Sequence, residues 1–228
     1  MLYLVSTPIG NLEDMSLRAI RILNEADIVA CEDTRHARIL FERHGIKPRR
    51  LVSYHSHNER SRAHELAEDL RTEAEVALIT DAGTPGISDP AWAIVKEAIA
   101  LGIEVVPIPG ACAAIAALTG SGLDTTRFVF EGFLPLKKGR QTRVRQVGEE
   151  ERTTVIYESP FRIKKLLTEL IAVCGAERKV TLAREITKLH ETFYRGTLEE
   201  VLAAVEKQFP EDVKGECVVV LEGKSDKP

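Results

Sequence analysis

The sequence lacks paired cysteines. Its four cysteines are far apart and form no C-x-x-C pattern: Cys31, Cys112, Cys174 and Cys217. A disulfide framework and a zinc site made from these residues are therefore disfavoured, because both need cysteines at close and repeated spacings. The pattern predicts reduced thiols, as in proteins of the cytoplasm.

The signatures of two common nucleotide-binding folds are also missing. The chain contains neither G-x-G-x-x-G nor G-x-x-x-x-G-K-[ST], which disfavours a dehydrogenase or a P-loop NTPase.

No apolar stretch approaches the length of a membrane span, and MLYLVSTPIGN has no basic region before an apolar one. We therefore expect a mature cytoplasmic protein without a membrane partner. An excess of positive charge is missing too, since the net charge is −4, so binding to RNA or DNA would need a local basic patch.

What the sequence does contain is the composition of a soluble globular protein, with 44% hydrophobic and 29% charged residues. Predicted strands and helices alternate in both halves, which favours two α/β domains. The run TGSGLDTT at 119–126 is the most linker-like stretch. We place the boundary there, with an N-terminal domain over residues 1–120 and a C-terminal domain over residues 121–228.

The most informative stretch is VALITDAGTPGISDP, at 76–90. Its apolar start predicts a buried strand, and a polar loop with two glycines follows. Glycine permits a positive φ or the close approach of a ligand, and Asp81, Thr84 and Asp89 supply acceptors and a hydroxyl beside it. In an open α/β sheet, ligands bind where such loops leave the carboxyl ends of strands. The alternative is a simple connection in which Asp89 caps a helix that begins at Pro90.

Other predicted strands of the first domain end in similar loops. The strands at 2–5, 27–31 and 51–53 run into STPIGN, EDTRH and YHSHNE, and the first of these turns leads into a predicted helix over 12–26. A strand at 103–108 ends in PGACAA, whose small residues let a backbone press against a ligand. We expect these loops to converge on one cleft.

The second domain carries a one-sided charge run. A predicted strand at 128–133 is followed by LPLKKGRQTRVRQV, which has five cations and no acid. A solvated helix face is the usual explanation of such a run, and an anion-binding surface is the alternative. Further predicted strands at 155–157 and 180–183 end in the polar loops ESP and REITKL.

Taken in order, several loops resemble those of the bacterial enzymes that 2'-O-methylate a cytidine ribose in the decoding region of 16S ribosomal RNA. The matching segments are STPIGN, CEDTR, TDAGTPGISDP, PGACAA, GFLPLKKGR, YESPFR and AREITKLHE. These enzymes are a branch of the tetrapyrrole methylase superfamily, and the likeness extends from Met1 to Gly223. It implies a tetrapyrrole methylase fold of two α/β domains with S-adenosylmethionine in the cleft between them. It also implies a homodimer that acts on 16S rRNA in the 30S subunit.

The resemblance further implies where the cofactor is contacted. The matching positions are Pro8, Asp81, Ala82, Gly83, Thr84, Ile87, Cys112, Ala113, Tyr157 and Glu158. Two positions depart from the pattern: relatives often have a hydroxyl or another small residue at Cys112 and a histidine at Phe161. Because a thiol is a weak hydrogen-bond partner, we expect no polar contact at Cys112. Because Phe161 is not a histidine, no histidine role is expected at that position.

Methyl transfer to a ribose hydroxyl is an in-line displacement that needs alignment and a proton acceptor. Asp33 is the leading hypothesis for the base, and its alternative is a salt bridge to Arg35. His55 and His57 are further candidates for the base, and a metal site made from them would lack a third ligand. Glu185 and Lys188, in a loop of the second domain, are our hypothesis for the residues that hold the ribose and its phosphate. The predicted RNA contacts are Arg35, Lys137, Lys138, Arg140 and Arg143.

Two other functions fit parts of the pattern. A methylase acting on a tetrapyrrole carbon would share the cofactor loops but would have no use for the cations at 137–145. A ribosome-assembly factor would bind RNA without catalysis. It would tolerate a bulky residue at Gly83, whereas a methyltransferase would not.

Overall fold

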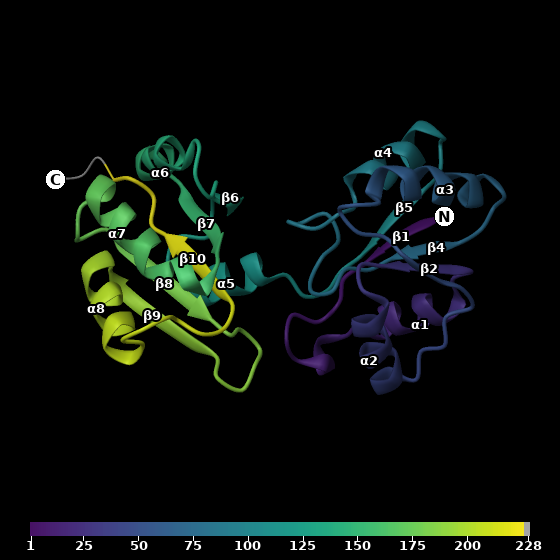
Figure 1. The fold of residues 1–228 in the computed structure, drawn as a ribbon, viewed down its shortest axis with the longest axis horizontal. Coiled ribbons are helices and arrows are strands. Elements are labelled where there is room, and N and C mark those ends of the chain that lie inside the picture. The colour runs from purple at the N-terminus through teal and green to yellow at the C-terminus, as the bar shows by residue number, and fades with distance from the viewer. Residues whose placement is uncertain (226–228) are drawn as a thin grey trace. The chain divides into compact units, whose positions relative to one another are not determined.

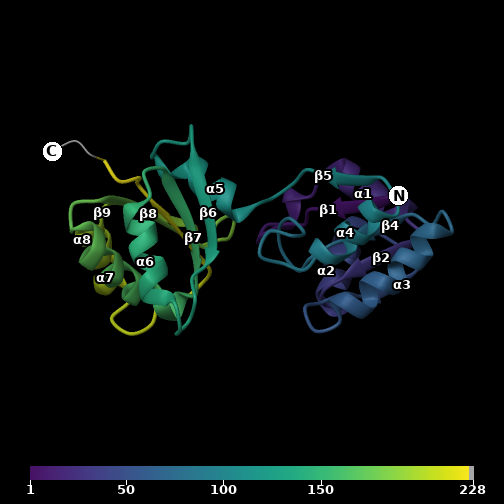
Figure 2. The same cartoon turned by 90° about the horizontal axis from the view of Figure 1, so that it is seen from above.

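The computed structural model describes residues 1–225. Contacts within the chain divide it into two compact units, the first from Met1 to Cys112 and the second from Ala113 onward. Each unit is a five-stranded sheet covered by helices (Figures 1 and 2). The prediction of two α/β units is therefore confirmed.

The strands are β1 (Leu2–Val5), β2 (Ile28–Cys31), β3 (Leu51–Ser53), β4 (Val76–Leu78), β5 (Val105–Ile108), β6 (Phe128–Phe133), β7 (Thr153–Glu158), β8 (Lys179–Arg184), β9 (Thr192–Thr197) and β10 (Cys217–Leu221). The α-helices are α1 (Leu17–Glu25), α2 (Thr34–His44), α3 (Glu59–Arg71), α4 (Trp92–Ala100), α5 (Ala113–Ser121), α6 (Arg140–Glu149), α7 (Ile163–Cys174) and α8 (Leu198–Gln208). Two short 3₁₀ helices are η1 (Leu12–Asp14) and η2 (Pro160–Arg162).

The sheet of the first unit is parallel throughout, in the order β3-β2-β4-β1-β5. Helices α1 and α2 pack on one face and α3 and α4 on the other (Figure 1). A parallel sheet covered on both faces buries both sides of its strands, which explains the continuous apolar runs of β2 and β4. Because all five strands run in one direction, the five loops at their carboxyl ends leave from the same edge, as predicted.

The second unit has a mixed sheet in the order β6-β7-β10-β8-β9. Only β6 and β7 pair in parallel, and the other neighbours are antiparallel. Helices α6, α7 and α8 share one hydrophobic core on one face. Helix α5 lies on the other face, where Thr181 Oγ1 donates to the Ser121 carbonyl at 2.9 Å. The loops after β6, β7 and β8 consequently leave from a common edge.

Helix α5 also explains a difference at the predicted domain boundary. The sequence places the boundary after residue 120, whereas the contacts divide the chain after Cys112. The stretch read as a linker is partly the end of α5, and Arg195 donates from Nε to the Gly120 carbonyl at 3.0 Å. Its small and polar residues serve close packing against the second sheet, since Gly120 lies under the ring of Phe193.

A second difference concerns the helix predicted over 12–26. It is two segments, η1 and α1, separated at Ser16. The Ser16 hydroxyl accepts a hydrogen bond from Ala19 N at 3.1 Å, which makes it the N-cap of α1. The apolar spacing continues through the break, and therefore periodicity alone did not show it.

The four cysteines form no disulfide. Burial raises the pKa of the Cys31 thiol to about 12, and burial likewise raises the pKa of the Cys217 thiol to about 12. Both thiols are therefore protonated and unreactive. Within residues 1–225, none of the helices combines the length and the apolar character that crossing a bilayer would require.

Candidate functional site

The carboxyl edge of the first sheet is where the loops after β1, β4 and β5 are fixed to one another. Thr7 and Gly83 exchange two backbone hydrogen bonds, at 2.9 and 3.1 Å. Thr84 Oγ1 donates to the Ala111 carbonyl at 3.0 Å, and Ser6 Oγ lies 3.0 Å from Thr84 Oγ1. Since the single hydroxyl proton of Thr84 is used, Ser6 is the donor of that pair. The three loops therefore hold one shape through their own hydrogen bonds.

Glycine is required at two places on this edge. Gly83 has a φ of 87°, in the left-handed region that glycine adopts without cost. Gly110 instead permits close approach, because a Cβ at this position would lie 2.7 Å from the Cβ of Ser6. The loops after β1 and β5 are in direct contact only because residue 110 has no side chain.

Several predicted cofactor positions belong to this edge. Ala82 and Ile87 are exposed, with Ile87 37% exposed, whereas Gly83 and Pro8 are buried. Cys112 is half-buried and ends the first unit, and Ala113 begins α5. The contacts of the cofactor with these positions stay predictions.

Acidic side chains gather at the ends of β2 and β4. Asp81 Oδ1 accepts a hydrogen bond from Asp33 N at 3.0 Å, and Asp81 Oδ2 lies 3.1 Å from Nδ1 of His36. Burial, together with the charge of Asp81, raises the pKa of Glu32. Burial and then the charge of Glu32 raise the pKa of Asp89 to about 6. The pKa of the Asp89 carboxyl group therefore lies close to neutral pH.

The alternative reading of Asp89 as a helix cap is wrong. Helix α4 begins at Trp92 with Ala91 as its N-cap, and no side chain caps it. Asp89 lies instead beside the Thr80 hydroxyl, which favours its ionised form and partly offsets the burial. The left-handed φ of Ser88, 65°, turns the chain between the loop and α4.

Asp33 makes the salt bridge that was the alternative to a role as base. Its carboxylate accepts from Arg35 Nη2 at 2.6 Å and, as the N-cap of α2, from Arg35 N at 2.8 Å. These hydrogen bonds hold the pKa of Asp33 well below its usual range. A carboxylate this stable in its ionised form is a weak proton acceptor.

His55 and His57 lie side by side after β3, with ring centroids 5.9 Å apart. The Nδ1 atom of His55 is buried and has no hydrogen-bond partner within residues 1–225. No third metal-ligating side chain joins the pair in that range. Nothing at Nδ1 fixes the tautomer of His55, which a histidine base ordinarily requires.

In the second unit, Glu185 and Lys188 are paired in a strained loop after β8. Lys188 Nζ donates to Glu185 Oε1 at 2.9 Å and to Glu216 Oε2 at 2.8 Å. Partial burial opposes the charge of Glu185, but hydrogen bonds from Lys188 and the Glu216 N–H outweigh it and lower the pKa. Glu185 and Thr187 have φ values of 53° and 68°, and two left-handed residues that are not glycine in one loop indicate a functional constraint.

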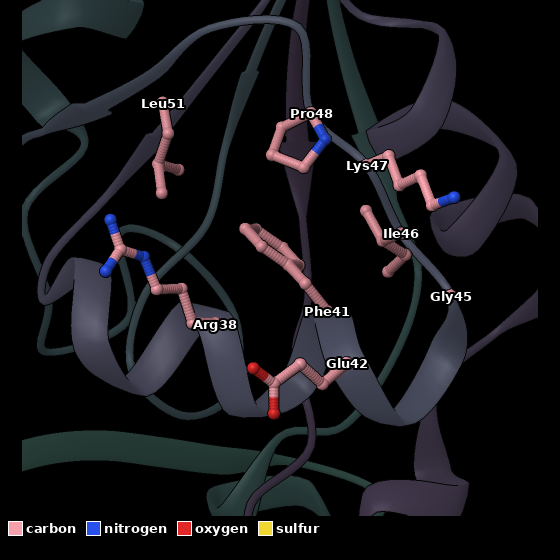
Figure 3. A pocket seen from close by; sticks show the side chains of 8 residues that line it. All are labelled: Arg38, Phe41, Glu42, Gly45, Ile46, Lys47, Pro48 and Leu51. Atoms are coloured by element: carbon pink, nitrogen blue, oxygen red, sulfur yellow. The ribbon is translucent and has the colours of Figure 1, made fainter.

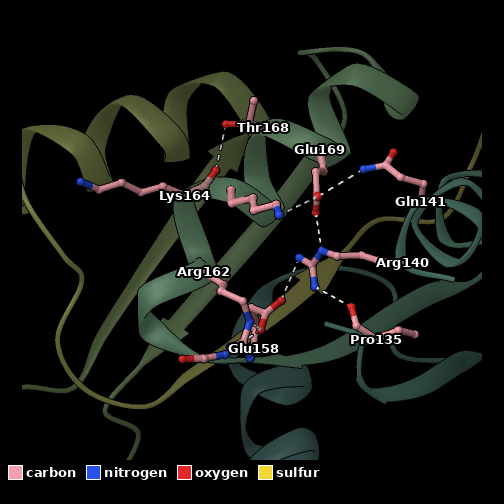
Figure 4. A network of polar contacts seen from close by, with 10 residues as sticks. Pro135, Arg140, Gln141, Glu158, Arg162, Lys164, Thr168 and Glu169 are labelled. Carbon is pink, nitrogen blue, oxygen red and sulfur yellow. Dashed lines mark hydrogen bonds and ion pairs between the residues drawn. The ribbon is translucent and has the colours of Figure 1, made fainter. Parts of the chain in front are cut away.

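Glu158 is the centre of a buried ionic network (Figure 4). Its side chain is fully buried and accepts from Arg140 Nη2 at 3.0 Å and from Arg162 Nε at 2.8 Å. Arg140 Nε also donates to Glu169 Oε2 at 2.9 Å. Both carboxylate oxygens of Glu158 are therefore used inside the unit, and the contact of Glu158 with the cofactor stays a prediction.

Tyr157, the neighbouring predicted cofactor contact, has a structural role that the sequence did not show. Its hydroxyl accepts a hydrogen bond from Ala114 N at 3.0 Å, in the first turn of α5. Its ring packs edge-to-face with Phe130 and Phe133, with centroid distances of 5.0 and 5.5 Å. Tyr157 thus ties the start of α5 to β6 and β7.

The predicted RNA contacts divide into exposed and occupied cations. Arg140 is 3% exposed and paired as described, so its assignment to RNA is wrong. Arg143 makes two hydrogen bonds to Glu131, both at 2.5 Å, which neutralise it. Lys137 and Lys138 are exposed and form no ion pair within residues 1–225. Arg35 is exposed but paired with Asp33.

Comparison with known proteins shows the family to which the chain belongs. The family profile of Tetrapyrrole (Corrin/Porphyrin) Methylases matches residues 1–202. The chain belongs to the tetrapyrrole methylase family. It is 46% identical over 225 residues to Ribosomal RNA small subunit methyltransferase I of Haemophilus influenzae, covering 98% of this chain and 79% of that protein. It is 48% identical over 224 residues to the protein of the same name from Synechocystis, with the same coverage.

Solved structures of lower identity show the same tetrapyrrole methylase fold. Diphthine synthase superposes with a TM-score of 0.73 at 19% identity, covering 97% of this chain and 89% of that one. Uroporphyrin-III C-methyltransferase from Thermus thermophilus, complexed with S-adenosylhomocysteine, gives a TM-score of 0.67 at 21% identity, covering 97% and 96%. The fold class predicted from the sequence is confirmed.

A separate hollow of about 440 Å³ is formed by α2, the loop that follows it and the start of β3 (Figure 3). Phe41 lies at its centre, and its lining residues are Arg38, Phe41, Glu42, Gly45, Ile46, Lys47, Pro48 and Leu51. The loop at 45–48 precedes β3, so the hollow is near the amino ends of the strands. It shares no residue with the loops of the carboxyl edge.

Two features of the site were missed in the sequence. Ser6 was seen only as part of a turn, although its hydroxyl joins two loops. Glu158 and Glu169 were not recognised as partners of Arg140, nor Arg162 as a second partner of Glu158, because these residues come from different elements. The charge run contains no acid, and so its cations were interpreted as unpaired. The acidic partners of Arg140 and Arg143 lie in other elements.

Proposed function

We propose that this chain is an S-adenosylmethionine-dependent methyltransferase that places a methyl group on the 2'-oxygen of a cytidine ribose in the decoding region of 16S rRNA. The observation that carries the proposal is the similarity over 98% of the chain to proteins named ribosomal RNA small subunit methyltransferase I. We further propose that it acts in the cytoplasm, as a homodimer, on the 30S subunit. The exposed Lys137 and Lys138 support an RNA substrate over a tetrapyrrole, because phosphate binding is dominated by cations.

The carboxyl edge of the first sheet has the chemistry that this cofactor requires. Asp81, Glu32 and Asp89 supply negative charge, which suits the sulfonium and ammonium groups. The exposed Ala82 is small, and the exposed Ile87 offers apolar surface to an adenine. S-adenosylmethionine supplies the electrophilic methyl group when bound.

We propose Asp89 as the group that accepts the ribose 2'-hydroxyl proton. It follows directly on the loop of the predicted cofactor contacts, and the pKa of its carboxyl group is raised to about 6. The best acceptor has a pKa close to the working pH, which disfavours Asp33. Glu185 and Lys188 stay our predicted contacts to the ribose and its phosphate.

The first test is transfer of labelled methyl from S-adenosylmethionine to 30S subunits that lack ribose methylation, with uroporphyrinogen as a control acceptor. We expect label in the 2'-O position of one cytidine of 16S rRNA and none in the porphyrinogen. Label in the porphyrinogen would establish the tetrapyrrole alternative. RNA binding without any transfer would establish an assembly factor.

A second test concerns Gly110. We expect Gly110→Ala to lower the rate of methyl transfer about 10²-fold, because the added methyl must displace Ser6 and, with it, the hydroxyl contact to Thr84. Calorimetric titration with S-adenosylhomocysteine should show weaker binding. The fluorescence of Trp92, the single tryptophan, reports whether the first unit is folded.

The matched control for this substitution is Gly102→Ala. Gly102 follows α4 with a φ of 71°, and a Cβ there would meet no atom within 4 Å. This variant carries left-handed strain of about 1 kcal/mol but should bind the cofactor normally. Normal binding by Gly110→Ala as well would show that contact between the loops does not shape the cofactor site.

A further inference from the structure

Exposed apolar side chains gather at one end of β6 and β7 in the second unit. These strands pair in parallel, with Phe133 opposite Tyr157, so the loops that follow them leave the sheet side by side. Phe133, Leu136 and Phe161 are 59%, 63% and 73% exposed. We call these three residues, together with Lys137 and Lys138, the aromatic edge. Neighbouring large apolar side chains left in water indicate a binding surface.

Hydrogen bonds to buried side chains hold the loops of the aromatic edge in place. Arg140 Nη1 donates to the Pro135 carbonyl at 3.3 Å, directly before Leu136. The Glu158 carboxylate, which binds Arg140, also accepts from Ser159 N at 2.9 Å and from Arg162 Nε at 2.8 Å, on either side of Phe161 (Figure 4). One buried carboxylate therefore fixes both loops, and the edge is preorganised before it binds a partner.

The charge of the aromatic edge selects the partner. Lys137 and Lys138 are exposed, and neither has a carboxylate partner in the described part of the chain. The acids of the adjoining elements, Glu131, Glu158 and Glu169, are buried or nearly so and already paired. Lysine is depleted from protein interfaces, whereas aromatic rings flanked by cations are the usual surface for unpaired nucleotides.

We propose that the aromatic edge binds single-stranded RNA, with Phe133 and Phe161 stacking on unpaired bases and Lys137 and Lys138 contacting phosphates. The inference rests on the proposed function, because an rRNA substrate is what gives this surface its ligand. It assigns a role to the phenylalanines, which make no polar contact. It also gives Arg140 a positioning role, since this buried arginine orders the loop that carries the lysines.

The test is binding of a fluorescein-labelled oligocytidylate of about 12 nucleotides, followed by fluorescence anisotropy at several salt concentrations. Phe161→Ala should weaken binding about tenfold, and Phe161→Trp should restore it. Lys137→Ala should reduce the slope of log K against log salt by about 0.7, whereas Phe161→Ala should leave that slope unchanged. The matched control is Phe128→Ala, a 37% exposed phenylalanine at the opposite end of β6, which should bind like wild type.

Three results would overturn the inference: failure of the wild type to bind the oligonucleotide, unchanged binding by both Phe133→Ala and Phe161→Ala, or an equal loss in Phe128→Ala. Sedimentation of the same variants adds a check. Dissociation into monomers with unchanged RNA affinity per protomer would assign the edge to self-association instead. If the phenylalanine variants bind the oligonucleotide more weakly but the wild type transfers no methyl group, RNA binding by the aromatic edge is supported and the proposed enzymatic function is rejected. Failure of one proposal is therefore distinguishable from failure of the other.

Discussion

Asp89→Asn is expected to lower methyl transfer about 10²- to 10⁴-fold and, at neutral pH, to make the first unit more stable. Asparagine keeps the size of the side chain but cannot accept the ribose proton. The rate of the wild-type enzyme should fall as the pH drops through about 6, where Asp89 becomes protonated. The variant should lack this part of the pH profile.

The stability gain follows from the direction of the pKa shift. The pKa of Asp89 is raised from 3.8 to about 6 on folding, so between these pH values the folded state holds a proton that the unfolded state has lost. The free energy of unfolding therefore decreases as the pH rises through this range. Removing the charge should recover about 1–2 kcal/mol at pH above 6, after allowance for partial exposure to solvent.

The matched control is Asp27→Asn, in the same unit. A hydrogen bond from the Glu75 N–H, followed by one from Arg49, lowers the pKa of Asp27, so its loss should destabilise the protein at neutral pH and leave methyl transfer intact. Unfolding in urea, followed by Trp92 fluorescence at pH 5 and pH 8, measures both variants. Full activity in Asp89→Asn would remove it as the acceptor and return the role to Asp33 or His55.

Glu158→Gln is expected to lower the free energy of unfolding by about 3–5 kcal/mol, the usual cost of removing one partner from a buried ion pair. The carboxylate lies between Arg140 and Arg162, and its side chain is fully buried. A neutral amide leaves the Arg140 guanidinium, which is itself buried, with only the Glu169 charge. Calorimetric unfolding of the whole chain should show a lower transition temperature.

Glu150→Gln makes the same chemical change on the surface. Glu150 pairs with Arg152, and the two side chains are 24% and 44% exposed, so the loss should be about 0–1 kcal/mol. Equal effects of the two substitutions would mean that burial of the Glu158 network contributes nothing to stability. The comparison separates the cost of burial from the loss of a charge.

Local patterns were sufficient for most of the elements and for the edge that carries the loops. The apolar runs of β2 and β4, bounded by polar and glycine-rich loops, predicted buried strands, because a parallel sheet covered on both faces buries both sides of a strand. The place of Gly83 in a polar loop predicted a positive φ or the close approach of a ligand, and its φ is 87°. The order of the motifs led to the family without any knowledge of distances.

What the sequence by itself determined is thus the alternation of strand and helix, the strand ends that carry the predicted site, and the resemblance. Tertiary structure alone decided which ionisable groups are free. Arg140, in the charge run, is buried against glutamates from β7 and α7. Burial, followed by the charge of Glu32 directly after β2, raises the pKa of Asp89 to about 6. Charge pairing and burial depend on neighbours that are distant in the chain, whereas periodicity and turn chemistry depend on neighbours within a few residues.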